Sequence, residues 1–145
     1  MTNLVDAPVR AVVAMVLTHR GDVCLLRRSG RVGSDVGRWH CVTGFLDRGV
    51  PPARHVLTEL VEETGLTVAD LDWWRHEADL VLPDGRSGSW RVHVYRAEAA
   101  TPRVVLNWEH DDVRWTPWAA AAGLDLVPWL GEVVAATDVG HPVAA

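Results

Sequence analysis

Apolar residues run almost without a break from Val9 to Leu17, and many of them are β-branched. Such a run is typical of a central strand that is buried on both faces. The turn-forming residues His19 to Asp22 follow, and Val23 to Arg28 forms a second strand-like run. The pattern therefore predicts a hairpin, then a surface loop rich in glycine and serine over residues 29–37, and a short strand from Trp39 to Gly44.

The pattern changes to a helical period after a loop that covers Phe45 to Val50. The helix is expected to begin at Pro51 or Pro52, because a proline's fixed φ and missing N–H are tolerated in the first turn. Gly65 follows the last helical residue and suits the left-handed C′ position. One side of this helix carries an apolar stripe that can pack into a core, made of Ala53, Val56, Leu57, Leu60 and Thr64.

The second half of the chain carries two longer strand-like runs, Leu71 to Leu82 and Ser89 to Glu98, joined by the turn Pro83 to Arg86. Three more elements are expected near the end: a strand over Val113 to Trp118, and helices over Ala119 to Gly123 and Val127 to Ala136. With 145 residues, no internal repeat and no long linker, the sequence predicts a single domain over residues 1–145, with a flexible tail over residues 138–145.

Three glutamates stand together on the predicted helix: Glu59, Glu62 and Glu63. Their i, i+3 and i+4 spacing brings the side chains to one side of a helix, opposite the apolar stripe. Like charges at these positions repel one another unless a cation lies between them, and clustered carboxylates suit Mg²⁺ or Mn²⁺. An acidic helix face is more often simply solvated, so the residues upstream decide between the two interpretations.

The upstream residues and the glutamates together resemble the signature of the Nudix hydrolase family. That signature reads Gly, five residues, Glu, seven residues, then Arg-Glu-apolar-any-Glu-Glu-any-Gly-apolar. Gly44 fits the opening glycine, and the later residues in register are Glu59, Leu60, Glu62, Glu63, Gly65 and Leu66. Two positions depart from the family, since Val50 stands in place of the first Glu and Thr58 in place of the Arg.

The resemblance implies an α/β fold, a Nudix-type α/β/α sandwich with a mixed sheet. It also implies metal-dependent hydrolysis of a phosphoanhydride bond in a nucleotide or a nucleoside-diphosphate-linked small molecule. The implied ligands of Mg²⁺ or Mn²⁺ are Glu59, Glu62, Glu63 and the carbonyl of Gly44, and Glu59 is also the implied catalytic residue. Because the family's arginine orients the neighbouring glutamate, its replacement by Thr58 predicts a slow or specialised pyrophosphohydrolase.

A second group of candidate catalytic residues, Glu109 and His110, lies in the segment from Trp108 to Trp115. Together with Val42-Thr43-Gly44, it looks like the subgroup of dihydroneopterin triphosphate pyrophosphatases and related nucleotide hydrolases. In relatives, a glutamate from such a late loop reaches the metal site as a ligand or general base. Glu109 is therefore the candidate and Glu98 the runner-up. A solvated loop acid and a structural histidine are equally consistent with this segment.

Substrate contacts are expected from arginine and tryptophan side chains. Arginine can bind phosphate bidentately, and the candidates are Arg27, Arg28 and Arg91. Arginines near strand ends, however, more often form ion pairs on the surface. Among the eight tryptophans, the candidates for stacking on a base or pterin ring are Trp39 and either Trp90 or Trp108. Most tryptophans are expected to fill the core instead. The predicted substrate-binding residues are Arg28, Trp39 and Arg91.

The overall composition excludes several classes of protein. A formal net charge of −5 argues against sequence-independent binding of DNA or RNA, which needs an excess of basic residues. All 14 basic residues are arginines, which excludes lysine Schiff bases and a Walker-type lysine. No apolar stretch suits a membrane span and no leader opens the chain, and Cys24 and Cys41 lack a Cys-x-x-Cys spacing. These features predict a cytoplasmic protein with reduced thiols, and the family resemblance allows a homodimer.

The sequence is also compatible with two other functions. The changes at Val50 and Thr58 are compatible with a Nudix-fold nucleotide-binding module that has lost turnover. One Nudix-like branch isomerises prenyl diphosphates with a cysteine and a glutamate, and Cys41 is the nearby cysteine in this chain. The apolar strand setting of Cys41 argues against that chemistry.

Overall fold

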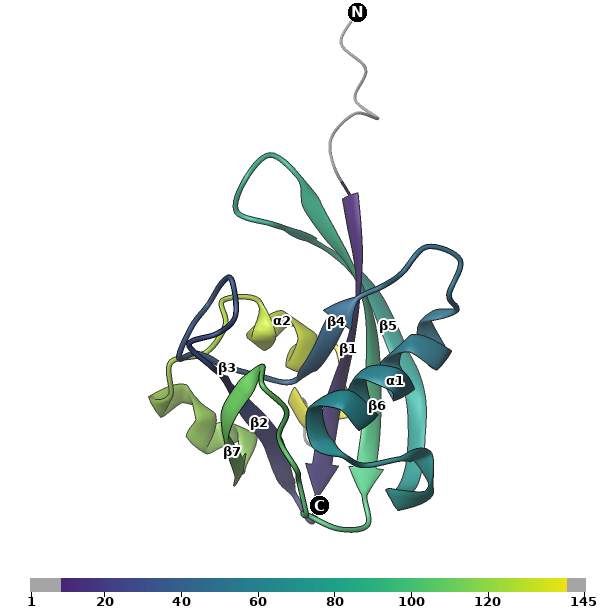
Figure 1. The fold of residues 1–145 in the computed structure, drawn as a ribbon, viewed down its shortest axis with the longest axis vertical. Coiled ribbons are helices and arrows are strands. Elements are labelled where there is room, and N and C mark those ends of the chain that lie inside the picture. The colour runs from purple at the N-terminus through teal and green to yellow at the C-terminus, as the bar shows by residue number, and fades with distance from the viewer. Residues whose placement is uncertain (1–8, 141–145) are drawn as a thin grey trace, which may run out of the picture.

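Residues 9–140 are described by the computed structural model, in which one mixed sheet carries helices on both of its faces (Figure 1). The strands are β1 (Val9–His19), β2 (Asp22–Arg28), β3 (Trp39–His40), β4 (Val42–Phe45), β5 (Leu71–Pro83), β6 (Ser89–Ala99) and β7 (His110–Thr116). The helices are α1 (Pro52–Thr64) and α2 (Leu130–Ala135), with the short 3₁₀ helices η2 (Val68–Asp70), η3 (Trp118–Gly123) and η4 (Asp138–Gly140). No helix within this range is long and apolar enough to cross a bilayer.

β1 is the centre of the sheet, as its continuous apolar run predicted. It pairs in parallel with β6 along most of its length and antiparallel with β2 and β4. β5 extends the sheet as an antiparallel partner of β6, and both β3 and β7 pair with β2. A strand that has neighbours on both sides and helices over both faces is shielded from water, and residues 12–18 of β1 are buried accordingly.

The sheet separates two apolar cores. Successive residues of a strand point to opposite faces, so Val13, Met15 and Leu17 of β1 pack in the core that α1 covers. Ala14 and Val16 point the other way and pack in the core that α2 covers. Because α1 lies over one face of the sheet and α2 over the other, the predicted α/β/α sandwich with a mixed sheet is confirmed.

The predicted strand from Trp39 to Gly44 is two short strands in the structure. β3 pairs with β2, whereas β4 pairs with β1, and Cys41 separates the two. The change of partner puts Gly44 opposite Val13 in the middle of β1. Since α1 packs beside β4, the opening glycine of the signature comes to lie next to the helix that carries its glutamates.

The elements near the C-terminus differ from the predicted ones: the strand expected over residues 113–118 is β7 at His110–Thr116, and α2 is shorter than the helix expected there. The helix expected over residues 119–123 is the 3₁₀ helix η3, and the helix expected from Val127 begins only at Leu130. Val127 precedes Pro128, and the residue before a proline avoids the helical region. The N–H of Val127 instead donates to the carbonyl of Trp39 at 3.0 Å. This bond ties the start of the α2 segment to β3.

Residues 138–140, which the sequence assigned to a flexible tail, form the helix η4 instead. The carboxylate of Asp138 lies 3.3 Å from Arg75 Nη2 and 3.4 Å from Arg96 Nε. These ion pairs place η4 beside β5 and β6. Residues 141–145 of the predicted tail lie outside the described residues.

Candidate active site

α1 begins and ends where the sequence predicted. Pro51 stands at the N-cap with extended backbone, and Pro52 is the first helical residue. Gly65 has a φ of 75° and donates its N–H to the carbonyl of Val61 at 2.9 Å. Glycine takes this left-handed conformation without a steric penalty, so the second glycine of the signature fixes the end of the helix.

The three glutamates of α1 differ in their exposure to solvent. Glu62 is exposed, Glu59 is partly buried, and Glu63 is fully buried. The prediction of a single anionic side is therefore wrong for Glu63. That residue lies seven positions after Val56 and three after Leu60, so it falls on the apolar stripe of the helix.

Glu59 packs directly against Gly44 of β4. A Cβ built onto Gly44 would overlap the Glu59 side chain, with a separation of 2.7 Å from its Cγ. Gly44 has no positive φ, so the close approach of the Glu59 side chain is what requires a glycine here. The strand β4 and the helix α1 thus meet at these two residues of the signature.

His55 lies beside Glu59, one helical turn before it. The side chain of His55 is mostly buried, and its Nε2 lies 3.3 Å from Glu59 Oε1 without forming a hydrogen bond in the described part of the chain. Thr58, which replaces the arginine of the signature, is exposed and donates its hydroxyl to the carbonyl of Arg54 at 3.3 Å. The sequence analysis missed His55, although its i, i+4 spacing from Glu59 was an available signal.

Glu63 is buried with few polar partners. The N–H of Thr43 donates to Glu63 Oε1 at 3.4 Å, and His110 Nε2 lies 3.9 Å from the same oxygen. The second oxygen, Oε2, is buried and has no hydrogen-bond partner within residues 9–140. Burial, the contact with Glu59 and the charge of Glu109 together raise the pKa of Glu63 well above the ordinary value for glutamate.

Glu59 and Glu63 are coupled to each other. Burial raises the pKa of Glu59, and the charges of Glu62 and Glu109 act in the same direction, whereas the contact with Glu63 lowers it. The same contact raises the pKa of Glu63, so the two carboxyl groups titrate as a coupled pair. Coupled carboxyl groups with perturbed pKa values are typical of a functional site and not of a solvated helix face.

Glu109 reaches the same site from the loop before β7. Its N–H donates to Asn107 Oδ1 at 3.1 Å, and Asn107 Nδ2 donates to Glu109 Oε1 at 3.4 Å. The carbonyl of Glu109 accepts the N–H of Ser29 at 2.8 Å, which fixes the loop against the end of β2. The runner-up Glu98 lies elsewhere, because it accepts the hydroxyl of Thr18 at 2.6 Å near the far end of β1.

An open pocket of about 590 Å³ brings these groups together between β4, α1 and the loop of Glu109. Its walls include Gly44, Val50, His55, Glu59, Glu62 and Glu109. A neighbouring pocket of about 180 Å³ shares Gly44 and Glu109 with the first and is bordered by Phe45 and Trp90. The two pockets are therefore adjacent parts of one concave surface.

The three predicted substrate-binding residues lie in different places. Arg28 borders the smaller pocket, and its Nε donates to the carbonyl of Ser34 at 2.9 Å. Trp39 is buried in the core beneath α2, with the guanidinium of Arg27 5.8 Å from its ring centroid. Arg91 is exposed on β6 and borders neither pocket. The structure therefore brings Arg28 to the site and places Trp39 and Arg91 away from it.

Phe45 is an aromatic residue at the site that the sequence analysis did not single out. Its ring lies 5.4 Å from the ring of Trp90, and the guanidinium of Arg10 stands 4.0 Å from its centroid. Phe45 is 51% exposed, so part of its ring is open to solvent. Its position directly after Gly44 was the signal that could have identified it.

The cysteines and His110 are unsuited to act as charged groups. Cys24 and Cys41 are free and buried, and burial raises the pKa of both thiols. A thiolate at Cys41, as an isomerase would use, is therefore disfavoured. Burial and the charge of Arg28 lower the pKa of His110 to about 4, so this histidine is neutral near pH 7.

The donor set of the pocket fits a hard divalent cation such as Mg²⁺ or Mn²⁺. Glu59 and Glu62 line the pocket and offer carboxylate oxygens. Glu63 lines neither pocket, and its Oε2 is a buried polar atom without a partner among the described residues. Coordination by a cation would satisfy that oxygen and relieve the repulsion between the carboxylates. The oxygens of the three glutamates do not all lie within 4.8 Å of one another.

Comparisons with known proteins give the family and the fold. The family model described as the NUDIX domain matches residues 7–137. The chain is similar to the NUDIX domain of Shewanella oneidensis NrtR, solved as a cocrystal with ADP ribose, at 18% identity and a TM-score of 0.75 over 94% of this chain and 90% of that one. It is also similar to the MutT protein from Methanosarcina mazei, at 21% identity and a TM-score of 0.73 over 86% and 88% of the two chains. At these identities the likeness shows the fold.

One curated relative shares more sequence but is a much longer protein. An octanoyltransferase of Myxococcus xanthus is 37% identical over 138 residues. The match covers 88% of this chain and 36% of that protein. The chain therefore spans about a third of the length of this relative.

Proposed function

The chain belongs to the Nudix family of pyrophosphohydrolases, and we propose that it hydrolyses a nucleoside diphosphate linked to a small molecule, with a divalent metal as cofactor. The observation that supports this proposal best is the pocket in which Glu59 and Glu109 meet beside Gly44. Glu109 comes from a loop fifty residues after Glu59, so the acidic groups gather through the fold and not only through helical spacing. Convergence of this kind is expected of a catalytic site.

The residues have distinct roles in this proposal. The metal ligands would be Glu59, Glu62, Glu63 and the carbonyl of Gly44. A bound Mg²⁺ or Mn²⁺ supplies positive charge for the anionic diphosphate oxygens and lowers the pKa of a nearby water. Glu109 acts as the general base that takes a proton from the attacking water, and the fixed loop around Asn107 orients its carboxylate.

The smaller pocket suits the nucleoside part of the substrate. Because it shares Gly44 and Glu109 with the carboxylate pocket, a molecule that spans both puts its diphosphate beside the glutamates. Phe45 and Trp90 offer aromatic faces for a base, and Arg28 can bind a phosphate. ADP ribose, which the similar NrtR domain was crystallised with, has this chemistry. Dihydroneopterin triphosphate is the further substrate that the sequence resemblance suggests.

A hydrolysis screen tests the proposal. The purified chain is incubated with Mg²⁺ and a panel of ADP ribose, sugar nucleotides, nucleoside triphosphates, dinucleoside polyphosphates and dihydroneopterin triphosphate. We expect turnover of at least one compound that stops when EDTA removes the metal. The Glu59→Gln variant should be slower by ~10²–10⁴-fold, because it lacks an ionisable group at the reacting centre. Product release no greater than that of Glu59→Gln across the whole panel would refute the proposal.

A nucleotide-binding module is the second candidate, and the position of Thr58 favours it. The hydroxyl of Thr58 bonds to Arg54 and gives Glu59 no charged partner, unlike the arginine of the signature. Calorimetry with ADP ribose separates the two functions, since a module binds the compound and leaves it intact. This candidate would be supported if only the Val50→Glu, Thr58→Arg double variant hydrolysed the bound compound. A homodimer and a cytoplasmic location remain predictions from the sequence.

A further inference from the structure

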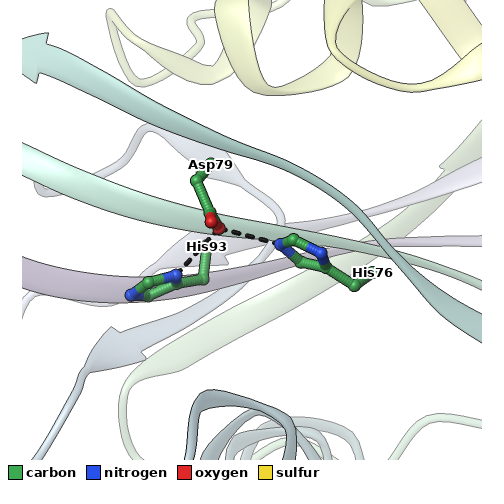
Figure 2. Close-up of side chains that lie close together, drawn as sticks. All are labelled: His76, Asp79 and His93. Carbon is green, nitrogen blue, oxygen red and sulfur yellow. Dashed lines mark hydrogen bonds and ion pairs between the residues drawn. The ribbon is translucent and has the colours of Figure 1, made fainter.

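A cluster of two histidines and one aspartate lies on the sheet, outside the pocket of Glu59. His76 and Asp79 belong to β5 and His93 to β6, and Figure 2 shows both rings turned toward the Asp79 carboxylate. Asp79 Oδ1 lies 2.8 Å from His76 Nε2 and 2.9 Å from His93 Nδ1. Within residues 9–140, these three residues are the one group of His, Cys, Asp or Glu whose ligand atoms all lie within 4.8 Å of one another.

A β-bulge brings the three side chains to one face of the sheet. In a regular strand, residues three positions apart point to opposite faces. The register of β5 shifts between His76 and Ala78, so Glu77 is an extra residue without its own partner on β6. The extra residue reverses the alternation, and Asp79 therefore shares a face with His76. Asp79 is paired across the strands with His93, which completes the cluster.

The cluster is open to solvent on one side and supported by the core on the other. The ring of His76 lies 5.2 Å from the ring of Tyr95, which belongs to the core beneath α1. The His93 side chain is 17% exposed, whereas the side chains of His76 and Asp79 are 48% and 55% exposed. An ion can therefore reach the cluster from water, and the packed His93 ring gives it one fixed ligand.

We propose that His76, Asp79 and His93 form a binding site for a divalent transition-metal ion, with Zn²⁺ as the best match. Two imidazole nitrogens and a carboxylate oxygen are ordinary zinc ligands, whereas Mg²⁺ prefers oxygen ligands. Two ligand atoms that are each about 2.0–2.1 Å from one ion lie roughly 2.9–3.4 Å apart. The separations of 2.8 and 2.9 Å between Asp79 Oδ1 and the two ring nitrogens are close to this range. Water completes the coordination of the ion.

The site is chemically distinct from the carboxylate pocket, and its effect is on the stability of the sheet. An ion held by His76 and Asp79 of β5 and by His93 of β6 would connect the bulged strand to its neighbour. Ligands that bind the folded chain and not the unfolded one raise the melting temperature. Zn²⁺ should therefore raise the melting temperature of this protein by a route that does not involve Glu59.

Calorimetric titration with Zn²⁺ in excess Mg²⁺ tests the proposal, because Mg²⁺ competes for oxygen ligands such as those of the carboxylate pocket and poorly for imidazole nitrogens. We expect one Zn²⁺ to bind per wild-type chain and the melting temperature to rise. His76→Gln and Asp79→Asn remove one ligand each at half-exposed positions, so both variants should fold. Loss of a supporting group around a metal weakens binding by about 10–100-fold, and loss of a direct ligand should weaken it at least as much.

His19→Gln is the matched control. His19 also lies at a strand position, and its Nδ1 is 2.7 Å from the carbonyl of Ala99, away from the cluster. This variant should bind Zn²⁺ like the wild type and show the same rise in melting temperature. Wild-type Zn²⁺ affinity in both His76→Gln and Asp79→Asn, or displacement of Zn²⁺ by Mg²⁺, would overturn the proposal.

Discussion

Replacement of Gly44 by alanine should disable the pocket while leaving the fold intact. Gly44 has no positive φ, so alanine can take its backbone conformation in β4. The added Cβ would stand 2.7 Å from Glu59 Cγ and closer still to the carboxylate, whereas ordinary contact begins at 3.4 Å. The Cγ must therefore move by roughly 0.7 Å and the carboxylate by about 1 Å. A misplacement of about 1 Å costs on the order of 10²-fold in rate.

Steady-state kinetics on the best substrate of the hydrolysis screen measures this effect. We expect kcat of Gly44→Ala to fall by about 10²-fold, with a smaller change in KM, because the displaced side chain, Glu59, does not line the smaller pocket proposed for the nucleoside. Gly30→Ala is the matched control, since a Cβ at Gly30 meets no atom within 4 Å. Thermal melting followed by circular dichroism checks that both variants fold. A Gly44→Ala enzyme with wild-type kcat would refute the idea that close contact with Gly44 positions Glu59.

Three further predictions concern the surroundings of the site. His55→Ala should lower kcat by about tenfold and change KM less, because His55 packs against Glu59 in the carboxylate pocket and does not line the smaller pocket proposed for the nucleoside. Equal loss in both constants would contradict a positioning role. Glu109→Gln should lower kcat by ~10²–10⁴-fold, whereas Glu98→Gln, outside the pocket, should match the wild type in the same assay. Burial lowers the pKa of His40 to about 3, against about 6.5 in the unfolded chain. The neutral, buried His40 therefore stabilises the folded state fully above about pH 6.5. As the pH falls, the unfolded chain binds a proton at this residue, and the free energy of unfolding decreases by about 2 kcal/mol by about pH 5. Urea unfolding at both pH values should show a smaller decrease in the free energy of unfolding for His40→Leu than for the wild type. An equal decrease in both proteins would argue against a neutral, buried His40.

The parts of the fold that could be predicted from the sequence are those encoded by local chemistry. The apolar run of β1, the prolines at the start of α1 and Gly65 at its end act through neighbouring residues, and the structure has them as predicted. The division of the strand at Cys41 could not be predicted, because it results from pairing with two different partners. Strand pairing depends on residues far away in the sequence.

The sequence predicted acidic residues that the fold brings to one pocket, but it did not predict their environments or the residues around them. The fixed offsets from Gly44 identified Glu59, and a late loop identified Glu109, which the fold brings to the same pocket. The burial of Glu63 was missed because its charge was given more weight than its place on the apolar stripe. The cluster around Asp79 was missed because the alternation of a regular strand puts it on the face opposite His76, and a bulge leaves no mark in the apolar pattern.

The helix η4, which begins at Asp138, stabilises β5, the outermost strand on its side of the sheet. Arg75 and Arg96 stand directly opposite each other on β5 and β6, and both guanidinium groups lie over the ring of Trp73, at 4.6 and 4.9 Å. Facing like charges weaken a pair of strands. The carboxylate of Asp138 contacts both arginines and offsets this repulsion. A chain that stopped before Asp138 would lose no strand residue, yet its outermost hairpin would be held less firmly.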